Sequence, residues 1–222
     1  WTRANGTLNA LTAIAYGQNR YVALGANSAI YTSTDAMTWA PGTANANAGF
    51  VSIAAGPNLF VAGSAGSAIY SSPTGTTWTQ RANSLGGAQN GAAYGNGRYV
   101  VVGDSGSIRH STDGLTWPVA PSGVTTSLRA VGWWEDVGFL ATGDSGVILN
   151  SADGIVWQQR ESGVSESLSA IAKTPIGYVA AGGSQGTLLA SLDGISWSIS
   201  AMPADKTIRG LAASASTVLA VG

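Results

Sequence analysis

Tryptophan recurs along this chain at an almost constant interval. Six of its eight tryptophans stand at positions 1, 39, 78, 117, 157 and 197, which gives spacings of 38, 39, 39, 40 and 40 residues. A fixed period of about 40 residues is typical of repeat proteins, in which each repeat is one supersecondary unit that packs on its neighbours. The period therefore restricts the chain to an array of similar units.

Each unit contains four short strand patterns, which we denote A to D. In the first unit they cover 11–16, 20–24, 29–32 and a stretch that begins at Trp39, with Gly, Asn and Asp between them as turn signals. Small residues dominate strand A, as in Ala92-Ala93, which suits an innermost strand where blades converge. Four strands per repeat predict an all-β fold, a β-propeller of four-stranded antiparallel blades, with a solenoid as the weaker alternative.

The repeats lie at about 7–46, 47–85, 86–124, 125–164 and 165–204, followed by a partial repeat at 205–222. The partial repeat holds only strands A and B, whereas residues 1–6 resemble a detached strand D. We therefore expect a single propeller domain over 1–222, with six blades and with the N-terminal strand completing the last one. A seven-bladed ring in a longer parent chain is the alternative. Closure of either kind removes exposed sheet edges.

Composition excludes several classes of function. Only 9% of the residues are charged and the formal net charge is −1, so we expect no nucleic-acid partner. No apolar run is long enough to span a membrane. Cysteine is absent and the chain has one histidine, so we expect no metal and no other cofactor. Low charge with many small polar residues favours an extracellular, cell-surface or virion location, with the periplasm also possible.

A short motif stands between strands C and D of every complete repeat. Its residues are Ser33, Asp35 and Trp39; Ser71, Gly75 and Trp78; Ser111, Asp113, Gly114 and Trp117; Ser151, Asp153, Gly154 and Trp157; and Ser191, Asp193, Gly194 and Trp197. The second copy has Pro73 where the others have Asp, and the other four copies are one residue shorter. The motif resembles the Asp-box of sialidases and other secreted propellers with BNR-type repeats.

This resemblance implies a propeller fold and a structural role for the motif. Asp and Ser side chains accept hydrogen bonds from nearby backbone N–H groups and hold a tight turn. Glycine supplies a positive φ, and the tryptophan packs between adjacent sheets. In the resembling sialidases, catalysis uses three arginines, a Tyr–Glu pair and an Asp. Here only Arg129 and Arg209 begin A strands near the axis, and the three glutamates lie elsewhere. We therefore expect no enzyme, with a glycan-active enzyme as the alternative.

Two groups of residues are candidates for ligand binding. Asp104 and Asp144 occupy equivalent B–C turns in neighbouring repeats, each within Gly-Asp-Ser-Gly, and either approach one another at one rim or simply form hairpin turns. The stretch Trp133, Trp134, Glu135 and Asp136 replaces the small polar A–B turn of other repeats. It suits a sugar-stacking platform or a protein contact patch, unless one tryptophan fills the space between blades.

We expect a non-catalytic propeller that acts as a binding or scaffolding module for a protein or a surface glycan. An adhesin, a lectin, a phage-tail component or an accessory subunit of a larger assembly all fit this description. Photosystem-assembly propellers, which resemble the chain in carrying such motifs, illustrate the last option. The fold alone does not decide between these functions.

Overall fold

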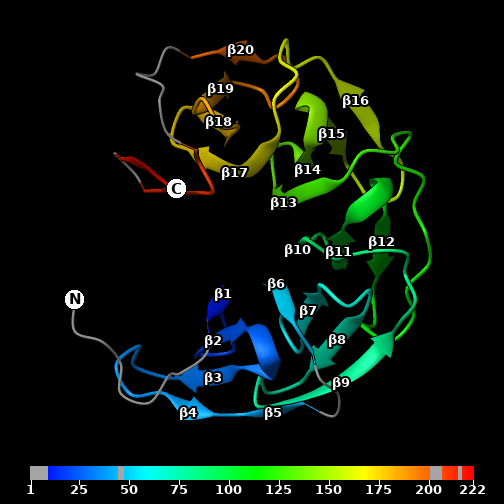
Figure 1. Cartoon of the computed structure of the whole chain (residues 1–222), viewed down its shortest axis with the longest axis vertical. Coiled ribbons are helices and arrows are strands. Elements are labelled where there is room, and N and C mark those ends of the chain that lie inside the picture. Colours follow the sequence, from blue (N-terminus) through cyan, green and yellow to red (C-terminus); the bar gives the residue numbers. More distant parts are fainter. Residues whose placement is uncertain (1–9, 45–47, 201–206, 215–216) are drawn as a thin grey trace.

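The computed structural model describes residues 10–44, 48–200, 207–214 and 217–222. Within these residues the chain forms an arc of antiparallel sheets around a central opening (Figure 1). The helical elements of the described residues are three single turns of 3-10 helix: η1 (Ala26–Ser28), η2 (Asp104–Gly106) and η3 (Asp144–Gly146). The all-β propeller predicted from the four-strand repeat is confirmed.

The sheets follow the repeats. The first contains β1 (Leu11–Gly17), β2 (Arg20–Gly25), β3 (Ile30–Ser33) and β4 (Ala40–Pro41). The second contains β6 (Phe50–Ala55), β7 (Phe60–Ser64), β8 (Ile69–Ser72) and β9 (Thr77–Ala82), and β5 (Thr43–Ala44) joins it parallel to β9. The third contains β10 (Gly91–Gly95), β11 (Arg98–Val102) and β12 (Ile108–Ser111), with an isolated bridge from Arg109 to Val119 in place of strand D.

The later sheets repeat this order. The fourth contains β13 (Leu128–Trp134), β14 (Gly138–Gly143), β15 (Ile148–Ser151) and β16 (Gln158–Arg160). The fifth contains β17 (Leu168–Thr174), β18 (Gly177–Gly182), β19 (Thr187–Ser191) and β20 (Ser198–Ile199). The described part of the sixth is the hairpin of β21 (Gly210–Ala213) and β22 (Val218–Val221). We refer to these sheets as blades 1 to 6.

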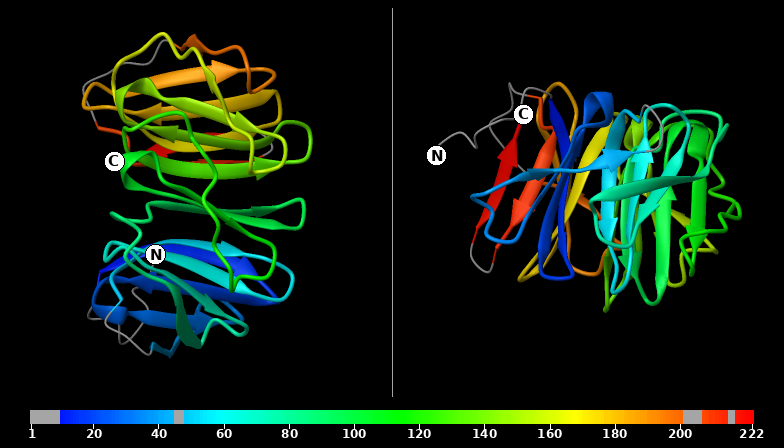
Figure 2. Two further views of the ribbon diagram at one scale, coloured as in Figure 1. Left: turned by 90° about the vertical axis from the view of Figure 1, so that its right-hand side faces the viewer. Right: turned by 90° about the horizontal axis from the view of Figure 1, so that it is seen from below.

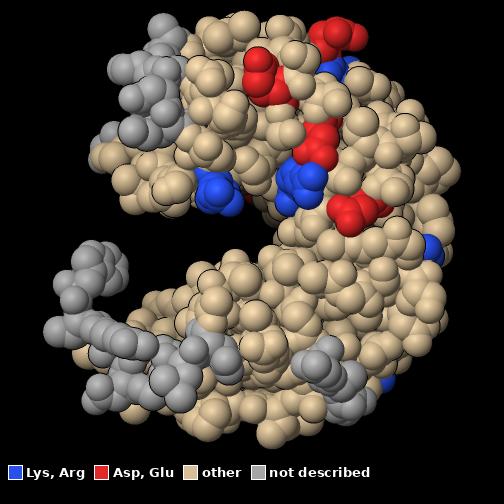
Figure 3. Space-filling view, in the orientation of Figure 1, with Lys and Arg blue, Asp and Glu red and all other residues tan. Residues whose placement is uncertain are grey.

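The innermost strands stand side by side along the arc (Figure 2). Each of β1, β6, β10, β13 and β17 packs against the innermost strand of the next blade. Among the described residues the ring is open between β1 and β21, and the space-filling view shows this opening running into the centre (Figures 1 and 3). The strand predicted at residues 1–6 lies outside the described residues, so its place in the last blade, and the choice between six and seven blades, remain predictions.

The apolar core lies in the seams between blades. Trp78 of the second C–D turn packs with Val22 of blade 1, Trp117 packs with Val61 of blade 2, and Trp157 packs with Val100 of blade 3. All three tryptophans are buried. The prediction that this tryptophan packs between adjacent sheets is therefore confirmed at these seams, where each indole touches strand B of the preceding blade.

The two ends of the arc expose residues that the inner blades bury. Leu11 is 46% exposed, whereas its repeat equivalents Phe50 and Leu128 are fully buried. At the other end Leu219 and Val221 are 59% and 55% exposed, although the equivalent β2 residues are buried. Blade 1 has no preceding sheet and blade 6 no following sheet among the described residues, so each end presents an unpaired apolar face.

Four of the five C–D turns have the hydrogen bonds predicted from the motif. In the second turn the Gly75 N–H donates to Ser72 Oγ, whereas Ser71, the predicted motif serine, accepts a bond from Arg81 Nε. Ser111 Oγ donates to Asp113 Oδ1 at 2.9 Å and accepts a bond from the Gly114 N–H at 2.7 Å. The same carboxylate oxygen accepts from the backbone N–H groups of Leu115 and Thr116. The turns at Asp35, Asp153 and Asp193 repeat the two bonds from the backbone to the carboxylate. These bonds stabilise the ionised carboxyl groups and lower their pKa values.

Acid should therefore destabilise the ring. Backbone N–H groups lower the pKa of Asp193 from 3.8 to about 2, and those of Asp113 and Asp153 move in the same direction. A carboxyl group whose pKa is lower in the folded state stabilises the fold above its unfolded pKa, and this contribution is lost as the pH falls through the folded pKa. We expect the urea midpoint to fall between pH 4 and pH 2, and a midpoint that is constant over this range would contradict the assignment.

Candidate functional site

The ring has two chemically different faces. One, which we call the B–C face, carries the B–C turns and the first residues of the innermost strands, as the bonds from Asp104 N–H to the Ala88 carbonyl and from Asp144 N–H to the Ser127 carbonyl show. The other, the C–D face, carries the A–B turns and the C–D turns. The two groups of candidate residues fall on different faces: Asp104 and Asp144 on the B–C face, and Trp133 to Asp136 on the C–D face.

One position on the B–C face ties neighbouring blades together. It is the second residue of the innermost strand pattern, and it recurs every 39 or 40 residues at positions 12, 51, 90, 129, 169 and 209. In three blades its side chain donates a hydrogen bond to a backbone carbonyl of the next blade: Thr12 to Phe50 at 2.6 Å, Asn90 to Leu128 at 2.9 Å, and Ser169 to Ile208 at 2.9 Å. The position therefore has a structural role in these blades.

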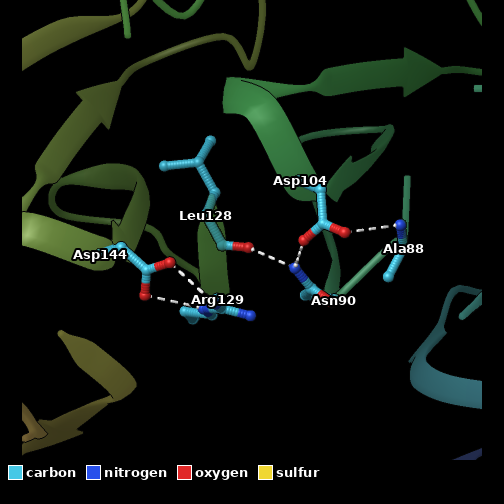
Figure 4. Close-up of polar contacts among 6 residues, drawn as sticks. All are labelled: Ala88, Asn90, Asp104, Leu128, Arg129 and Asp144. Atoms are coloured by element: carbon cyan, nitrogen blue, oxygen red, sulfur yellow. Dashed lines mark hydrogen bonds and ion pairs between the residues drawn. The ribbon is translucent and has the colours of Figure 1, made fainter. Parts of the chain in front are cut away.

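Arg129 departs from this pattern. Its guanidinium instead donates two hydrogen bonds to Asp144 in its own blade, from Nε to Oδ1 at 2.9 Å and from Nη2 to Oδ2 at 2.6 Å (Figure 4). The two side chains are 41% and 26% exposed, so the pair stays open to solvent. The bonds to Asp144 raise the pKa of Arg129, and those from Arg129 lower the pKa of Asp144. A bidentate pair of this kind fixes the plane of the guanidinium.

Asp104 lies in the equivalent turn of blade 3 and has different partners. It accepts hydrogen bonds from Asn90 Nδ2 and from the Ala88 N–H, both at 2.9 Å (Figure 4). The bond from Asn90 lowers its pKa. Asn90 also bonds the carbonyl of Leu128, so the polar contacts run from blade 3 to blade 4. Asp104 and Asp144 thus lie in equivalent turns on the B–C face, each held by its own partners, and a ligand site that they share stays a prediction.

This pair of carboxyl groups is poorly suited to glycoside hydrolysis. That reaction needs one carboxyl group that stays protonated as the general acid, and a raised pKa provides it. The pKa values of Asp104 and Asp144 are both lowered. Two ionised carboxylates with donor partners can bind and orient a ligand, but they hold no proton to deliver to a leaving group.

Arg209 directly precedes β21, at the same repeat position as Arg129, and is exposed. We define the inner rim as Asn90, Asp104, Arg129, Asp144 and Arg209. Figure 3 shows acidic and basic side chains gathered on the arm formed by the later blades, with basic groups facing the central opening. Residues 10–87 contain only three charged residues, at positions 20, 35 and 81, so the opposite arm is nearly neutral. Charge is therefore concentrated on one side of the opening.

The two adjacent tryptophans on the C–D face pack against protein. A Cβ atom at Gly95 would lie 1.9 Å from the Trp133 ring, so this indole lies over the glycine of the neighbouring blade. Trp134 covers Gly132 and meets Tyr178 of blade 5 edge to face, with 5.4 Å between ring centroids. Both rings remain partly accessible. This packing agrees with the alternative that a tryptophan fills the space between blades. Ligand binding at Trp133 to Asp136 stays a prediction.

Asp136 of blade 4 also contacts blade 5. It accepts hydrogen bonds from Tyr178 Oη and from Lys173 Nζ, both at 2.6 Å, and the Lys173 ammonium lies 5.4 Å from the centre of the Tyr178 ring. Lys173 lowers the pKa of Asp136. Glu135 is exposed. Lys173 and Tyr178 could not be predicted as partners of Asp136, because they lie 37 and 42 residues away from it in the sequence.

The double substitution Trp133→Ala with Trp134→Ala should destabilise the fold. Trp133 packs against the apolar cluster between blades 3 and 4, so we expect a loss of about 2–3 kcal/mol in the free energy of unfolding. Urea denaturation measures it, and Leu115→Ala, at a 52% exposed residue, is the control. Unchanged stability of the double variant would instead support a binding platform.

No protein-family model and no curated protein matches the sequence. Solved structures do match the fold. YCF48 from Cyanidioschyzon merolae is 17% identical with a TM-score of 0.68, over 93% of this chain and 76% of that chain. The WD40 repeats of RRP9 are 10% identical with a TM-score of 0.78, over 97% and 74%. A structure of YCF48 bound to a D1 peptide is 16% identical with a TM-score of 0.61, over 87% and 82%.

These likenesses and the blade geometry define the class: the chain is a β-propeller of four-stranded antiparallel repeats. Sequence identities below 20% show only that the folds are alike. The likeness of the C–D motif to the Asp-box therefore stays a resemblance and does not establish the family. Within the part of the chain that the structure describes, no helix is long and apolar enough to cross a membrane.

Proposed function

We propose that this propeller is a non-catalytic interaction module that holds an extended segment of a partner protein at the inner rim. One observation carries the proposal. Arg129 does not form the blade-to-blade hydrogen bond that its repeat position makes in three other blades, and Asp144 instead holds its guanidinium in a solvent-accessible position. A residue that departs from a structural repeat and is kept exposed, rigid and charged is suited to recognition.

The chemistry of the rim indicates the partner. A guanidinium has five N–H donors, and Asp144 occupies two of them, so donors remain for a carboxylate or a backbone carbonyl. Arg209 adds a second cation, while Asp104 and Asp144 balance the charge. A mixed rim of this kind suits a peptide with an acidic side chain and free main-chain groups, and it suits nucleic acid poorly.

The structural neighbours agree with a protein ligand. The solved YCF48 structure with a D1 peptide shows a propeller of this fold holding a peptide, although that property belongs to YCF48. Lowered pKa values at Asp104 and Asp144 support a role without catalysis. An extracellular, cell-surface or virion location and the alternative of a glycan ligand at Trp133 and Trp134 remain proposals from composition and motif.

A peptide-binding experiment tests the proposal. A pool of fluorescein-labelled twelve-residue peptides containing Asp and Glu is titrated with the chain and followed by fluorescence polarisation, with a Ser/Asn pool as the neutral probe. We expect binding of the acidic pool, weakened at least tenfold by Arg129→Gln and by Arg209→Gln. Arg20→Gln removes the same charge from the start of β2 near the C–D face and should change affinity less than twofold. Equal effects of the three substitutions would overturn the assignment.

A further inference from the structure

The side-chain amide of Asn90 is held in one orientation. Its nitrogen, Nδ2, donates one hydrogen bond to Asp104 Oδ1 and another to the Leu128 carbonyl, both at 2.9 Å. Both partners are acceptors, so a rotated amide would place its own oxygen against two other oxygens. The amide oxygen, Oδ1, is therefore turned away from both partners. It has no hydrogen bond within the described residues and stays accessible to solvent.

Arg129 presents a free donor beside this acceptor. Its Nε and Nη2 bind Asp144, so the remaining nitrogen, Nη1, keeps its N–H groups without a partner among the described residues. Figure 4 shows the nitrogen that is not bonded to Asp144 directed to the side on which Asn90 lies. Asn90 itself bonds the carbonyl of Leu128, the residue directly before Arg129. An acceptor of blade 3 and a donor of blade 4 therefore lie next to each other across one seam.

The repeat position that holds Asn90 and Arg129 has other chemistry elsewhere in the arc. It is Thr12 in blade 1 and Val51 in blade 2, and because valine has no polar side-chain atom, the seams on both sides of blade 2 offer no such pair. In blade 6 it is Arg209, whose guanidinium has no carboxylate partner within the described residues. A fixed amide oxygen beside a fixed guanidinium is thus a feature of the seam between blades 3 and 4.

We propose that Asn90 and Arg129 together bind a main-chain amide of the peptide held at the inner rim. Asn90 Oδ1 accepts a hydrogen bond from a backbone N–H of the ligand, and Arg129 Nη1 donates one to the carbonyl of the same ligand residue. In an extended strand these two groups point to the same edge, which lets antiparallel strands exchange paired hydrogen bonds. This inference rests on the proposed function and assigns recognition at this seam to the ligand's main chain.

The donor and acceptor together select an amide group. A carboxylate has only acceptors, so it can bind Arg129 but would place an oxygen against Asn90 Oδ1. An ammonium has only donors and would meet the guanidinium with like charge. An amide satisfies both atoms, and a peptide carries it in its main chain and in Asn and Gln side chains. The main chain is favoured because every residue of it offers the group and no side-chain rotamer has to be fixed.

A backbone-methylated peptide tests this assignment. The probe is a fluorescein-labelled twelve-residue peptide of alternating aspartate and alanine with an amidated C-terminus. It is compared with the same peptide N-methylated at every residue, by fluorescence polarisation on the full chain. We expect methylation to weaken binding at least tenfold, because it removes the N–H group that Asn90 accepts. This comparison uses the unaltered protein and does not depend on the folding of a variant.

Asn90→Ser isolates the acceptor. Ser169 shows that a serine at this repeat position still bonds the carbonyl of the next blade, at 2.9 Å, so the seam keeps its bond while the amide oxygen is lost. We expect this variant to bind the unmethylated peptide about tenfold more weakly and to reduce the effect of methylation to less than threefold. Arg209→Gln is the matched control, which should weaken binding of both peptides by the same factor.

The outcomes separate this inference from the proposed function. Equal binding of the two peptides, or an effect of methylation that is the same in Asn90→Ser, would overturn the inference alone. A methylated peptide of alternating asparagine and alanine whose binding still depends on Asn90 would assign the pair to a side-chain amide, which also overturns it. If the unmethylated acidic peptide does not bind, the proposed function fails and this inference fails with it.

Discussion

Replacing Trp78 by alanine should lower the free energy of unfolding by about 4 kcal/mol. The indole is fully buried in the seam between blades 1 and 2, with its ring centre 5.6 Å from that of Phe50. Its Nε1 donates a hydrogen bond of 2.9 Å to the Gly75 carbonyl. The substitution therefore removes a large apolar group from two sheets at once and leaves a carbonyl without its donor. Urea denaturation followed by circular dichroism measures the change.

Trp39→Ala is the matched control for this prediction. Trp39 has the same place in the repeat and the same bond from Nε1, here to Ala36 at 3.2 Å, but no preceding blade covers it among the described residues. We expect a loss of about 1 kcal/mol or less. Equal losses for Trp78 and Trp39 would show that the tryptophan stabilises its own turn and not the seam.

Gly106→Ala should cost about 3 kcal/mol or more. Gly106 closes η2 with a φ of +69°, and a Cβ there would lie 2.0 Å from the carbonyl oxygen of Val124. Both a left-handed backbone and a clash with main chain then oppose the new side chain. Because η2 also holds Asp104, the same substitution should weaken peptide binding at the inner rim.

Gly123→Ala separates the two causes. Gly123 has a φ of +77°, but a Cβ there would meet nothing within 4 Å. We expect it to cost about 1 kcal/mol, the backbone penalty alone. If Gly106→Ala and Gly123→Ala lower the free energy of unfolding equally, the clash with the Val124 carbonyl adds nothing to the backbone penalty, and the close approach described for this turn is wrong.

Sequence reasoning succeeds here where structure is local and periodic. The four strands, the C–D turns and the burial of Trp78, Trp117 and Trp157 all follow from short patterns that recur in every repeat. Trp39 is less buried than these three tryptophans, because burial at this position requires a preceding blade and the described residues place none before blade 1. The pattern within its own repeat does not predict this difference.

Only some residues of the inner rim could be predicted from the sequence. Asp104 and Asp144 stand out as acidic residues in equivalent turns, but their partners do not. Arg129 meets Asp144 across 15 residues of a sheet, and Asn90 meets Asp104 across 14. Arg129 and Arg209 stand at a repeat position that otherwise holds Thr, Val, Asn or Ser, and this change to a charged residue was the signal available in the sequence.

The central claim is that a peptide binds at the inner rim, and backbone amide NMR of the 22.3 kDa chain tests it most directly. The acidic twelve-residue peptide pool is added to isotope-labelled protein. We expect shift changes concentrated at Asn90, Arg129, Asp144 and Arg209, with little change at residues 133–136. Changes concentrated at residues 133–136 on the C–D face, with the inner rim undisturbed, would contradict it.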